Sequence, residues 1–174
     1  LDGTVYRGET LLPGVQDAID ELRDAGSDIL FFSNNPTKSG QEYVERLREF
    51  GLDVRPEEAC SAGDVTTRFL CEHHAEDSIM LVGADGLREQ FHAAGLTVTA
   101  DPERTEVFVG SWTPSFGYED MVTALRAIDA DTPFFGTDPD RTFPGENGQV
   151  SPGSGAVVNA LAGTVGREPD AFMG

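Results

Sequence analysis

Two short segments carry residue types that could hold a phosphate group and move a proton. D-G-T at residues 2–4 puts a carboxylate and a hydroxyl on one tight turn, and its glycine would let the backbone approach a ligand closely. S-N-N at residues 33–35 offers a hydroxyl and backbone N–H groups that suit the oxygens of an anion such as phosphate. Each segment by itself is also an ordinary turn sequence, so neither is specific alone.

The elements that would position these segments alternate along the chain. Short apolar runs, typical of buried parallel strands, predict strands at 29–32, 79–82, 96–99, 107–109 and 134–135. Apolar residues at helical spacing predict helices at 15–25, 39–50, 64–73, 87–94, 121–128 and 158–165, the second of which begins with an S-x-x-E capping box. The segment 136–155 is rich in Gly, Pro and Asp and is expected to be a long loop. The alternation predicts an α/β fold with parallel strands.

Ligands of an open parallel sheet bind at the carboxyl ends of its strands. The residues of interest are therefore the first few of the chain and those that follow the expected strands, at 33–35, 83–85, 110–111 and 136–140. S-N-N falls directly after the expected strand at 29–32.

The composition excludes several classes of protein. The chain has 174 residues and 18.7 kDa, which suits one ordinary domain or a domain with a moderate insert. No apolar run approaches the ~20 residues of a membrane span, and no secretory signal is evident. A net charge of −19 argues against non-specific binding to nucleic acid. Cys60 and Cys71 are too few for a disulfide scaffold and lack metal-site spacing, so a reduced cytoplasmic setting is expected.

The acidic excess has an interpretation of its own. The chain has 31 Asp and Glu against 12 Lys and Arg, and Lys38 is its single lysine. Self-repulsion in such a chain is screened at molar salt, where the Debye length falls to ~3 Å. We therefore expect a salt-adapted, halophilic organism; the alternative is an acidic protein from an ordinary source.

Taken together and in order, the motifs resemble the haloacid dehalogenase (HAD) superfamily of phosphatases, and within it the p-nitrophenylphosphatase-like subfamily with a large α/β cap (class IIA). The resemblance covers essentially the whole chain. It is carried by D-G-T-V-Y-R-G at 2–8, I-L-F-F-S-N-N-P-T-K-S at 29–39, V-G-A-D-G-L at 82–87, F-G-T-D-P-D at 135–140 and S-P-G-S-G at 151–155. It implies a Rossmann-like parallel-sheet core, here incomplete, with an inserted α/β cap.

The resemblance implies roles for particular residues. The family pattern opens with D-x-D-G-T, in which the first Asp is the nucleophile that takes the phosphoryl group. Asp2 matches the second Asp, which is the general acid and base and binds Mg²⁺ through its backbone carbonyl. Ser33 would bind phosphate through its hydroxyl with help from the backbone N–H of Asn34, while Gly3 and Thr4 would shape the loop.

Three parts of the family pattern have no counterpart in the chain. The nucleophile would lie immediately before Leu1, and the catalytic lysine, commonly in G-K-P, and an acidic metal-binding motif would follow Gly174. Lys38 matches the subfamily's N-N-P-T-K-S context instead, so a solvated or loop-bracing lysine is expected there. We therefore expect an internal fragment of a phosphatase that is inactive by itself in aspartyl-phosphate chemistry.

The resemblance also divides the chain, with residues 1–62 as the N-terminal part of the core, 63–150 as the cap and 151–174 as the return to the core. The cap would cover the active site and read the leaving group. The subfamily's T-N-x-D element matches Thr137 and Asp140, which are expected to face the substrate. Asp138 stands where the family has Asn, which puts its role in doubt, and an exposed surface loop is the alternative for both aspartates. A homo-oligomer formed through the cap is also implied.

Other residues invite weaker interpretations. His73 and His74 have no ligand partner at suitable spacing and are expected at an exposed helix end. Trp112 and Phe116 flank a proline after an expected strand, and either line the face of the cap or pack in the interior.

Two functions from different classes stay open. The first is a Mg²⁺-dependent hydrolase of small phosphorylated metabolites that works through an aspartyl-phosphate; the family implies sugar phosphates, phosphoglycolate, nucleotides and aryl phosphates as candidate substrates. The second is a non-catalytic HAD-like binding or subunit-interaction protein that lacks the nucleophile and the lysine.

Overall fold

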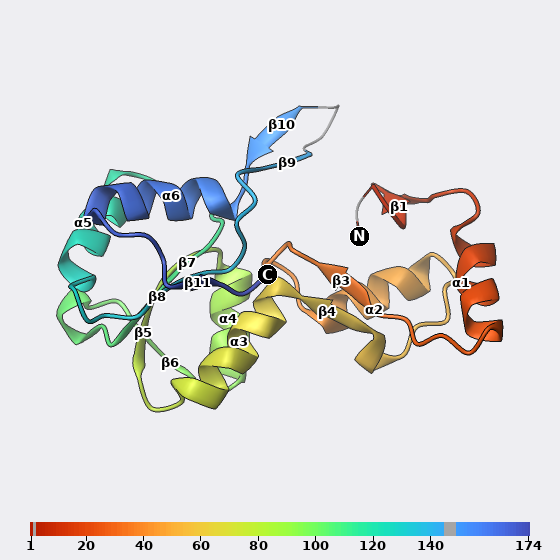
Figure 1. The fold of residues 1–174 in the computed structure, drawn as a ribbon, viewed down its shortest axis with the longest axis horizontal. Coiled ribbons are helices and arrows are strands. Elements are labelled where there is room, and N and C mark those ends of the chain that lie inside the picture. The colour runs from red at the N-terminus through yellow and green to blue at the C-terminus, as the bar shows by residue number, and fades with distance from the viewer. Residues whose placement is uncertain (2, 145–148) are drawn as a thin grey trace.

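A computed structural model describes residues 1, 3–144 and 149–174, and it combines parallel strands with helices (Figure 1). The helices are α1 (Val15–Asp24), α2 (Gly40–Glu49), α3 (Ala62–His73), α4 (Asp85–Ala93), α5 (Tyr118–Ala127) and α6 (Ser154–Val165), with 3₁₀ turns at Pro56–Glu58 and Pro102–Arg104. The strands are β1 (Tyr6–Arg7), β2 (Thr10–Leu11), β3 (Phe31–Ser33), β4 (Ala59–Ser61), β5 (Ser78–Val82), β6 (Thr97–Thr99), β7 (Val107–Gly110), β8 (Phe134–Gly136), β9 (Thr142–Pro144), β10 (Val150–Pro152) and β11 (Ala171–Phe172). The predicted α/β class with parallel strands is confirmed.

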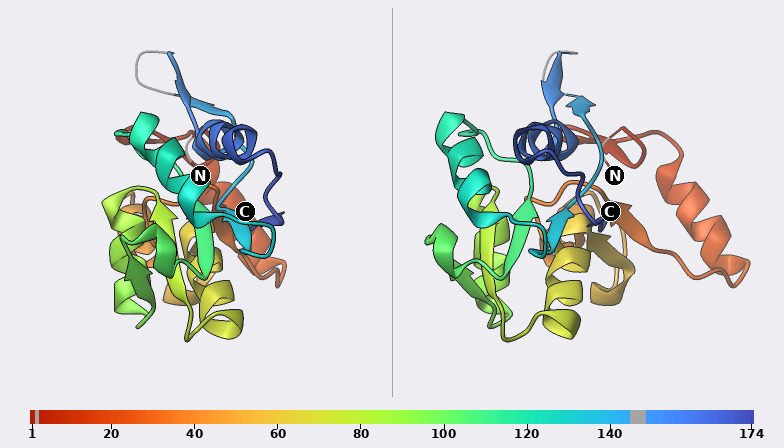
Figure 2. Two further views of the ribbon diagram at one scale, coloured as in Figure 1. Left: turned by 90° about the vertical axis from the view of Figure 1, so that its left-hand side faces the viewer. Right: turned by 60° about the vertical axis from the view of Figure 1, so that its left-hand side comes forward.

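The larger sheet has five parallel strands in the order β11-β8-β7-β5-β6. Successive side chains of β5 point to opposite faces, so Met80 and Val82 pack toward α5 and α6, whereas Ile79 and Leu81 pack toward α3 and α4. Figure 2 shows the two helix layers on either side of this sheet. Burial on both faces explains why the strand is a continuous apolar run.

The smaller sheet consists of β3 and β4, paired in parallel, and packs against α1 and α2. The strand expected at 29–32 runs instead from Phe31 to Ser33, and it is not buried throughout: Phe32 is 40% exposed, and Leu30, just before the strand, is 62% exposed. The helices cover one face only, and Phe31 lies on that face, so burial alternates along the strand. The strand β4 was not predicted, because A-C-S has no apolar run.

The segment 136–155, expected to be a long loop, contains the antiparallel pair β9 and β10, with Thr142 opposite Pro152 and Pro144 opposite Val150. The expectation was wrong for residues 142–144 and 150–152, whereas residues 137–141 have no helix or strand, as expected of a loop. Residues 145–148 of the predicted loop lie outside the described residues.

The predicted division into domains stays a prediction, but the packing bears on its second boundary. Val158 and Leu161 of α6 are fully buried in the cluster that covers one face of the five-stranded sheet, and β11 pairs with β8. Residues 154–172 therefore pack with the predicted cap and not with the β3–β4 unit, because the apolar face of α6 matches the cap sheet. We propose that the cap extends to Phe172. In the part of the chain that the structure describes, no helix is long and apolar enough to cross a membrane.

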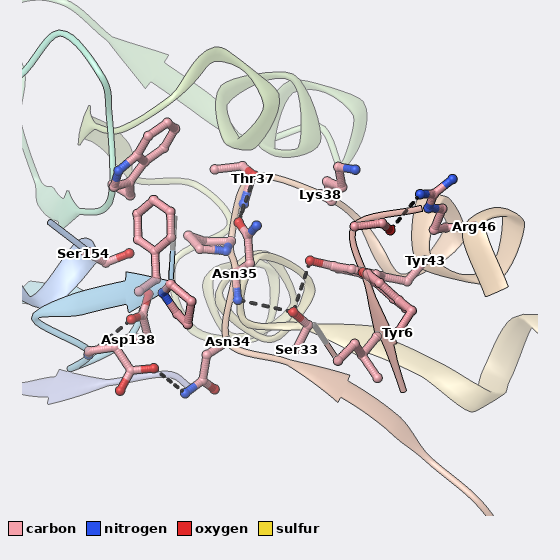
Figure 3. A pocket seen from close by; sticks show the side chains of 18 of the residues that line it. Tyr6, Ser33, Asn34, Asn35, Thr37, Lys38, Tyr43, Arg46, Asp138 and Ser154 are labelled. Carbon is pink, nitrogen blue, oxygen red and sulfur yellow. Dashed lines mark hydrogen bonds between the residues drawn. The ribbon is translucent and has the colours of Figure 1, made fainter. Parts of the chain in front are cut away.

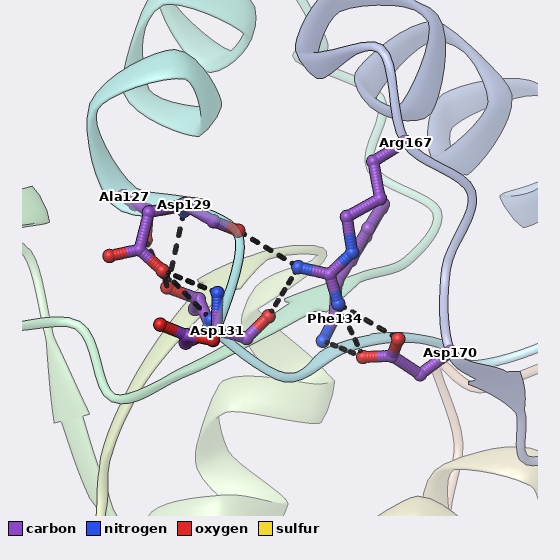
Figure 4. A network of polar contacts seen from close by, with 7 residues as sticks. Ala127, Asp129, Asp131, Phe134, Arg167 and Asp170 are labelled. Carbon is purple, nitrogen blue, oxygen red and sulfur yellow. Dashed lines mark hydrogen bonds and ion pairs between the residues drawn. The ribbon is translucent and has the colours of Figure 1, made fainter.

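Arg167 ties the end of α6 to this sheet (Figure 4). Its guanidinium donates to the backbone carbonyls of Asp129 and Thr132, at 2.9 and 2.8 Å, and to both carboxylate oxygens of Asp170, at 2.8 and 2.7 Å. Asp170 in turn accepts from the backbone N–H of Phe134 at 2.8 Å. Arg167 and Asp170 together thus join the end of α6, the segment between α5 and β8, and the segment that leads into β11.

We expect Arg167→Met to lower the free energy of unfolding by about 2 kcal/mol, because it leaves two carbonyls and a carboxylate without their charged donor. Denaturant unfolding measures this change. Arg126→Met is the matched control, since Arg126 is exposed on α5, and should change stability by less than about 0.5 kcal/mol. Equal effects of the two substitutions would contradict the role given to Arg167.

Candidate functional site

A cavity of about 530 Å³ lies where the end of β3 faces the loop that follows β8. Residues 33–38 line one wall, and Asp138, Asp140, Gly153 and Ser154 line the opposite wall. Figure 3 shows Ser33 and Asn34 on the first side and Asp138 and Ser154 on the second. Two strand ends that are about a hundred residues apart in the sequence thus meet at one cleft.

Ser33 is buried at the end of β3, and its hydroxyl is already positioned by neighbours. The Oγ donates to the hydroxyl of Tyr43 at 3.0 Å and accepts from the backbone N–H of Asn35 at 3.3 Å. Tyr43 lies on α2. This helix begins at the predicted capping box, which is confirmed, and its start fixes the position of Tyr43 beside Ser33. The Ser33 hydroxyl and nearby N–H groups can hold an anion in the cleft.

Asn34 links the two walls. Its Nδ2 donates to a carboxylate oxygen of Asp140 at 3.1 Å, and both residues line the cavity. The expected proximity of the S-N-N segment to Asp140 is therefore present in the structure. The substrate contact expected of Asp140 stays a prediction.

The turn after Asn35 touches two helices through its backbone. A Cβ at Gly63 of α3 would lie 2.7 Å from the carbonyl oxygen of Pro36, and one at Gly86 of α4 would lie 2.7 Å from that of Thr37. Real Cβ atoms do not approach so closely, so only glycine permits this contact. The helices of the predicted cap thereby fix the loop that carries Ser33 and Asn34.

Thr137 does not face the cleft, contrary to expectation. It is fully buried and absent from the lining residues, and its hydroxyl donates to Ser111 at 3.0 Å and to Asp138 at 3.3 Å. Thr137 directly follows β8, and its hydrogen bonds to Ser111 and Asp138 stabilise the loop that begins there.

Asp138 lines the cleft but is only 3% exposed. Burial raises the pKa of this carboxyl above its ordinary value of 3.8, although hydrogen bonds from Ser154, the backbone N–H of Asp140 and Thr137 act in the opposite direction. No arginine or lysine pairs with it among the interactions of the described residues. The structure thus places a carboxyl where the family pattern has an amide, and gives it surroundings that favour the neutral form.

The predicted catalytic residue Asp2 lies outside the described residues, so the structure does not place its side chain or its backbone carbonyl. Gly3 and Thr4 are exposed and are not among the residues that line the cavity. Gly3 has a φ of +76° and its N–H donates to the carbonyl of Tyr6 at 2.7 Å, as expected of a tight turn. Leu1 and Tyr6, which flank this turn, do line the cavity.

Several lining residues were not identified from the sequence as parts of the site. Tyr43 and Arg46 project from α2, and Phe143 comes from β9, which was expected to be loop. Trp112, for which lining and packing were both open, lines the cavity, whereas Phe116 packs in the interior. Lys38 is exposed as expected and also lines the cavity. The sequence around Tyr43 and Arg46 predicted only a helix. No local pattern indicated that these two side chains line the cleft.

The remaining candidates lie elsewhere. His74 is half-buried, not exposed, and its Nδ1 lies 2.8 Å from a carboxylate oxygen of Asp77. Cys60 and Cys71 are unpaired thiols. Over residues 1, 3–144 and 149–174, no group of three or more His, Cys, Asp or Glu side chains could hold a metal ion.

Comparison with known proteins gives this arrangement a context. A family model described as haloacid dehalogenase-like hydrolase matches residues 1–97. An acid sugar phosphatase of Staphylococcus haemolyticus is 31% identical over 174 residues, which are 100% of this chain and 65% of that protein.

Solved structures agree. A p-nitrophenyl phosphatase from Archaeoglobus fulgidus has a TM-score of 0.90 at 35% identity, over 99% of this chain and 66% of that one. A glycerol phosphate phosphatase from Mycobacterium tuberculosis, in complex with magnesium, has a TM-score of 0.84 at 27% identity, over 100% of this chain and 52% of that one. The chain spans 65% to 66% of the length of the curated relatives it matches.

The raised pKa of Asp138 predicts a pH dependence of stability. Folding is favoured while this carboxyl is protonated, so its contribution is complete below 3.8 and is lost as the pH rises through the raised folded-state pKa. Asp138→Asn removes the buried charge and should raise the melting temperature at pH 7 by a few degrees, about 2–6 °C, with the difference vanishing below pH 3.8.

Thermal unfolding from pH 3 to pH 8 in high salt measures the difference between variant and parent. Asp131→Asn is the control, since it removes the same charge from an exposed side chain. A pH-independent difference for Asp138→Asn would contradict the assignment.

Proposed function

The chain belongs to the haloacid dehalogenase-like hydrolases, in the p-nitrophenylphosphatase-like subfamily, and from this premise we propose that the intact protein hydrolyses small phosphate monoesters. The observation that carries the proposal is the cleft itself: Ser33 and Asn34 share it with Leu1. An aspartate immediately before Leu1 would have its Cα about 3.8 Å from that of Leu1. The expected nucleophile would therefore stand at the same cleft as the expected phosphate-binding loop.

In the proposed reaction, that aspartate carboxylate attacks the phosphorus and displaces the alcohol oxygen of the ester. Asp2 starts protonated, donates its proton to the departing oxygen and later removes one from the water that hydrolyses the aspartyl-phosphate. This step restores the nucleophile as a carboxylate and Asp2 as a carboxylic acid, and it releases inorganic phosphate. The Ser33 hydroxyl and the Asn34 backbone N–H hold phosphate oxygens in both steps. We also propose that the intact protein contains the catalytic lysine that the family pattern places after Gly174.

We also propose that the reaction requires Mg²⁺. This part of the proposal is supported by the family resemblance and by the relative whose structure was solved with magnesium. The described residues do not by themselves fit such a site, since they contain no cluster of three candidate ligands and the expected ligand Asp2 lies outside them.

The size of the cleft supports a small substrate. A cavity of about 530 Å³ is in the range that holds metabolites and drug-sized molecules. The relatives are named acid sugar phosphatase, p-nitrophenyl phosphatase and glycerol phosphate phosphatase, and we propose a small phosphorylated metabolite as the substrate of this protein. The cytoplasmic location, the adaptation to salt and an oligomer formed through the cap stay predictions.

Phosphate release from phenyl phosphate by the intact protein in high salt tests the proposal. We expect turnover with Mg²⁺, and we expect Ser33→Ala to lower kcat/KM by about 10- to 100-fold, because it removes a hydrogen bond to a charged group worth about 1.5–3 kcal/mol. Ser115→Ala, an exposed serine that does not line the cavity, is the control and should leave kcat/KM unchanged.

Two results would contradict the proposal. Equal kcat/KM for Ser33→Ala and the parent would show that Ser33 does not bind the phosphate of the substrate. Phosphate binding without any turnover by the intact protein would favour the non-catalytic alternative.

A further inference from the structure

The side chain of Arg46 makes contacts on several sides where it lines the cleft. Its guanidinium donates to a carboxylate oxygen of Glu49 at 2.9 Å and to the backbone carbonyl of Gly8 at 3.0 Å, and it pairs with Glu9 at 2.7 Å. The centre of the Phe50 ring lies 4.5 Å from the central carbon of the guanidinium, a cation–π contact. An arginine of α2 thus holds the segment 8–9, which is remote from it in the sequence.

The segment 8–9 is the turn of the hairpin formed by β1 and β2. Gly8 has a φ of +55°, in the left-handed region that glycine adopts without strain. The hydrogen bond from Arg46 fixes this turn through its backbone carbonyl. A second contact acts at the start of β1, where the ring of Tyr6 packs on that of Phe50 with their centroids 5.1 Å apart. The hairpin is therefore attached to α2 at both ends of β1.

The hairpin in turn holds the D-G-T turn. The carbonyl of Tyr6 accepts from the N–H of Gly3 at 2.7 Å, and the carbonyl of Leu1 accepts from the N–H of Val5 at 2.9 Å. The two neighbours of Asp2 in the sequence are thus hydrogen-bonded to β1 and to the residue that precedes it. A displacement of the hairpin would therefore displace the turn on which the general acid and base is expected.

The contacts of Arg46 leave it little capacity to bind a substrate anion. The carboxylates of Glu9 and Glu49 balance its charge. Hydrogen bonds to them raise the pKa of the guanidinium, so it stays charged at any pH of an assay. A phosphate in the cleft would have to displace one of these partners. Arg46 therefore holds the hairpin and not the substrate.

The same helix holds the expected phosphate-binding residue. Tyr43 lies three residues before Arg46, on the same face of α2, and its hydroxyl accepts from that of Ser33 at 3.0 Å (Figure 3). One side chain of α2 thus places the Ser33 hydroxyl, and another places the hairpin. The distance from the phosphate-binding hydroxyl to the general acid depends on both contacts.

We propose that Arg46 is a positioning residue of the proposed reaction, which aligns the general acid Asp2 with the departing ester oxygen by fixing the turn of the β1–β2 hairpin. This inference rests on the proposed function, because it takes Asp2 to be the proton donor. When the P–O bond breaks, its electron pair goes to the ester oxygen, which takes the proton of the Asp2 carboxylic acid. A displaced hairpin misaligns this transfer and leaves phosphate binding at Ser33 unchanged.

The test compares two esters as substrates of the intact protein in high salt. Phenolate is a basic leaving group that needs a proton as it departs, whereas 2,4-dinitrophenolate is stable as an anion and needs none. We expect Arg46→Met to lower kcat/KM for phenyl phosphate about 10- to 100-fold, the size of a misaligned proton transfer, and for 2,4-dinitrophenyl phosphate by less than about threefold. The loss for phenyl phosphate should lie in kcat, with KM within about twofold of the parent value.

Two further arginine variants assign the effect to the hairpin. Arg48→Met is the matched control, since Arg48 lies on the same helix and donates to the carbonyl of Val54 at 2.9 Å, and neither residue lines the cavity. It should leave kcat/KM for both esters within about twofold of the parent. Arg46→Lys keeps a charge near Glu9 but lacks the planar fork that also reaches Gly8, and it should restore part of the loss for phenyl phosphate.

A second pair of variants decides the matter if Arg46→Met does not fold. Glu9 and Glu49 both pair with Arg46, and both are exposed, at 87% and 66%. Only Glu9 belongs to the hairpin. Glu9→Gln should lower kcat/KM for phenyl phosphate about two- to fivefold and leave the dinitrophenyl ester unchanged, whereas Glu49→Gln should change neither.

The outcomes separate this inference from the function beneath it. Equal losses for the two esters, no loss for either, or a rise in KM without a change in kcat would overturn the positioning role of Arg46 and leave the proposed hydrolase intact. Absence of turnover of both esters by the parent protein would overturn the proposed function and this inference with it.

Discussion

The site depends on a close backbone contact between the turn after β3 and two helices of the predicted cap. The carbonyl oxygens of Pro36 and Thr37 approach α3 and α4 so closely that Gly63 and Gly86 cannot carry a side chain. This contact sets where β3 ends relative to the five-stranded sheet. Since Ser33 and Asn34 belong to the same loop, it also sets the distance across the cleft, and the hydrogen bond from Asn34 to Asp140 follows from it.

The chain is strongly acidic, so the way in which its buried carboxylates are stabilised is a second constraint on the structure. Burial by itself raises the pKa of Glu58, but hydrogen bonds from Arg55 and the charge of Arg23 more than offset this effect, so the pKa is lowered. Burial also raises the pKa of Asp170, but hydrogen bonds from the N–H of Phe134 and from Arg167 more than offset this effect, so the pKa is lowered. Asp138 has hydrogen bonds but no arginine, so burial prevails. Glu58 and Asp170 are thus paired with arginines, whereas Asp138 has no such partner among the described residues and lines the cleft, where groups with perturbed pKa values are often functional.

The cleft joins two kinds of surface. Its polar wall comes from the end of β3 and from the loop after β8, and its aromatic wall comes from the segment after β7 and from β9. Only the polar wall matches motifs with a recognisable pattern, because phosphate binding needs particular backbone geometry. The aromatic wall needs only ring surface at the correct place, which many sequences could supply, so no short motif predicts it.

The sequence by itself determined the α/β class, the helices with strong apolar stripes and capping signals, and the family, because these depend on local periodicity and on short motifs in order. It predicted S-N-N directly after a strand, and the structure places Ser33 as the last residue of β3, although that strand is buried on one face only. The β9–β10 pair, the strand β4 and the attachment of α6 and β11 to the larger sheet were decided by tertiary contacts, since short strands carry too little local signal. The position of Thr137 inside the loop, the raised pKa of Asp138 and the meeting of Trp112 with Phe143 were likewise decided by packing, because burial and proximity arise only when distant segments come together.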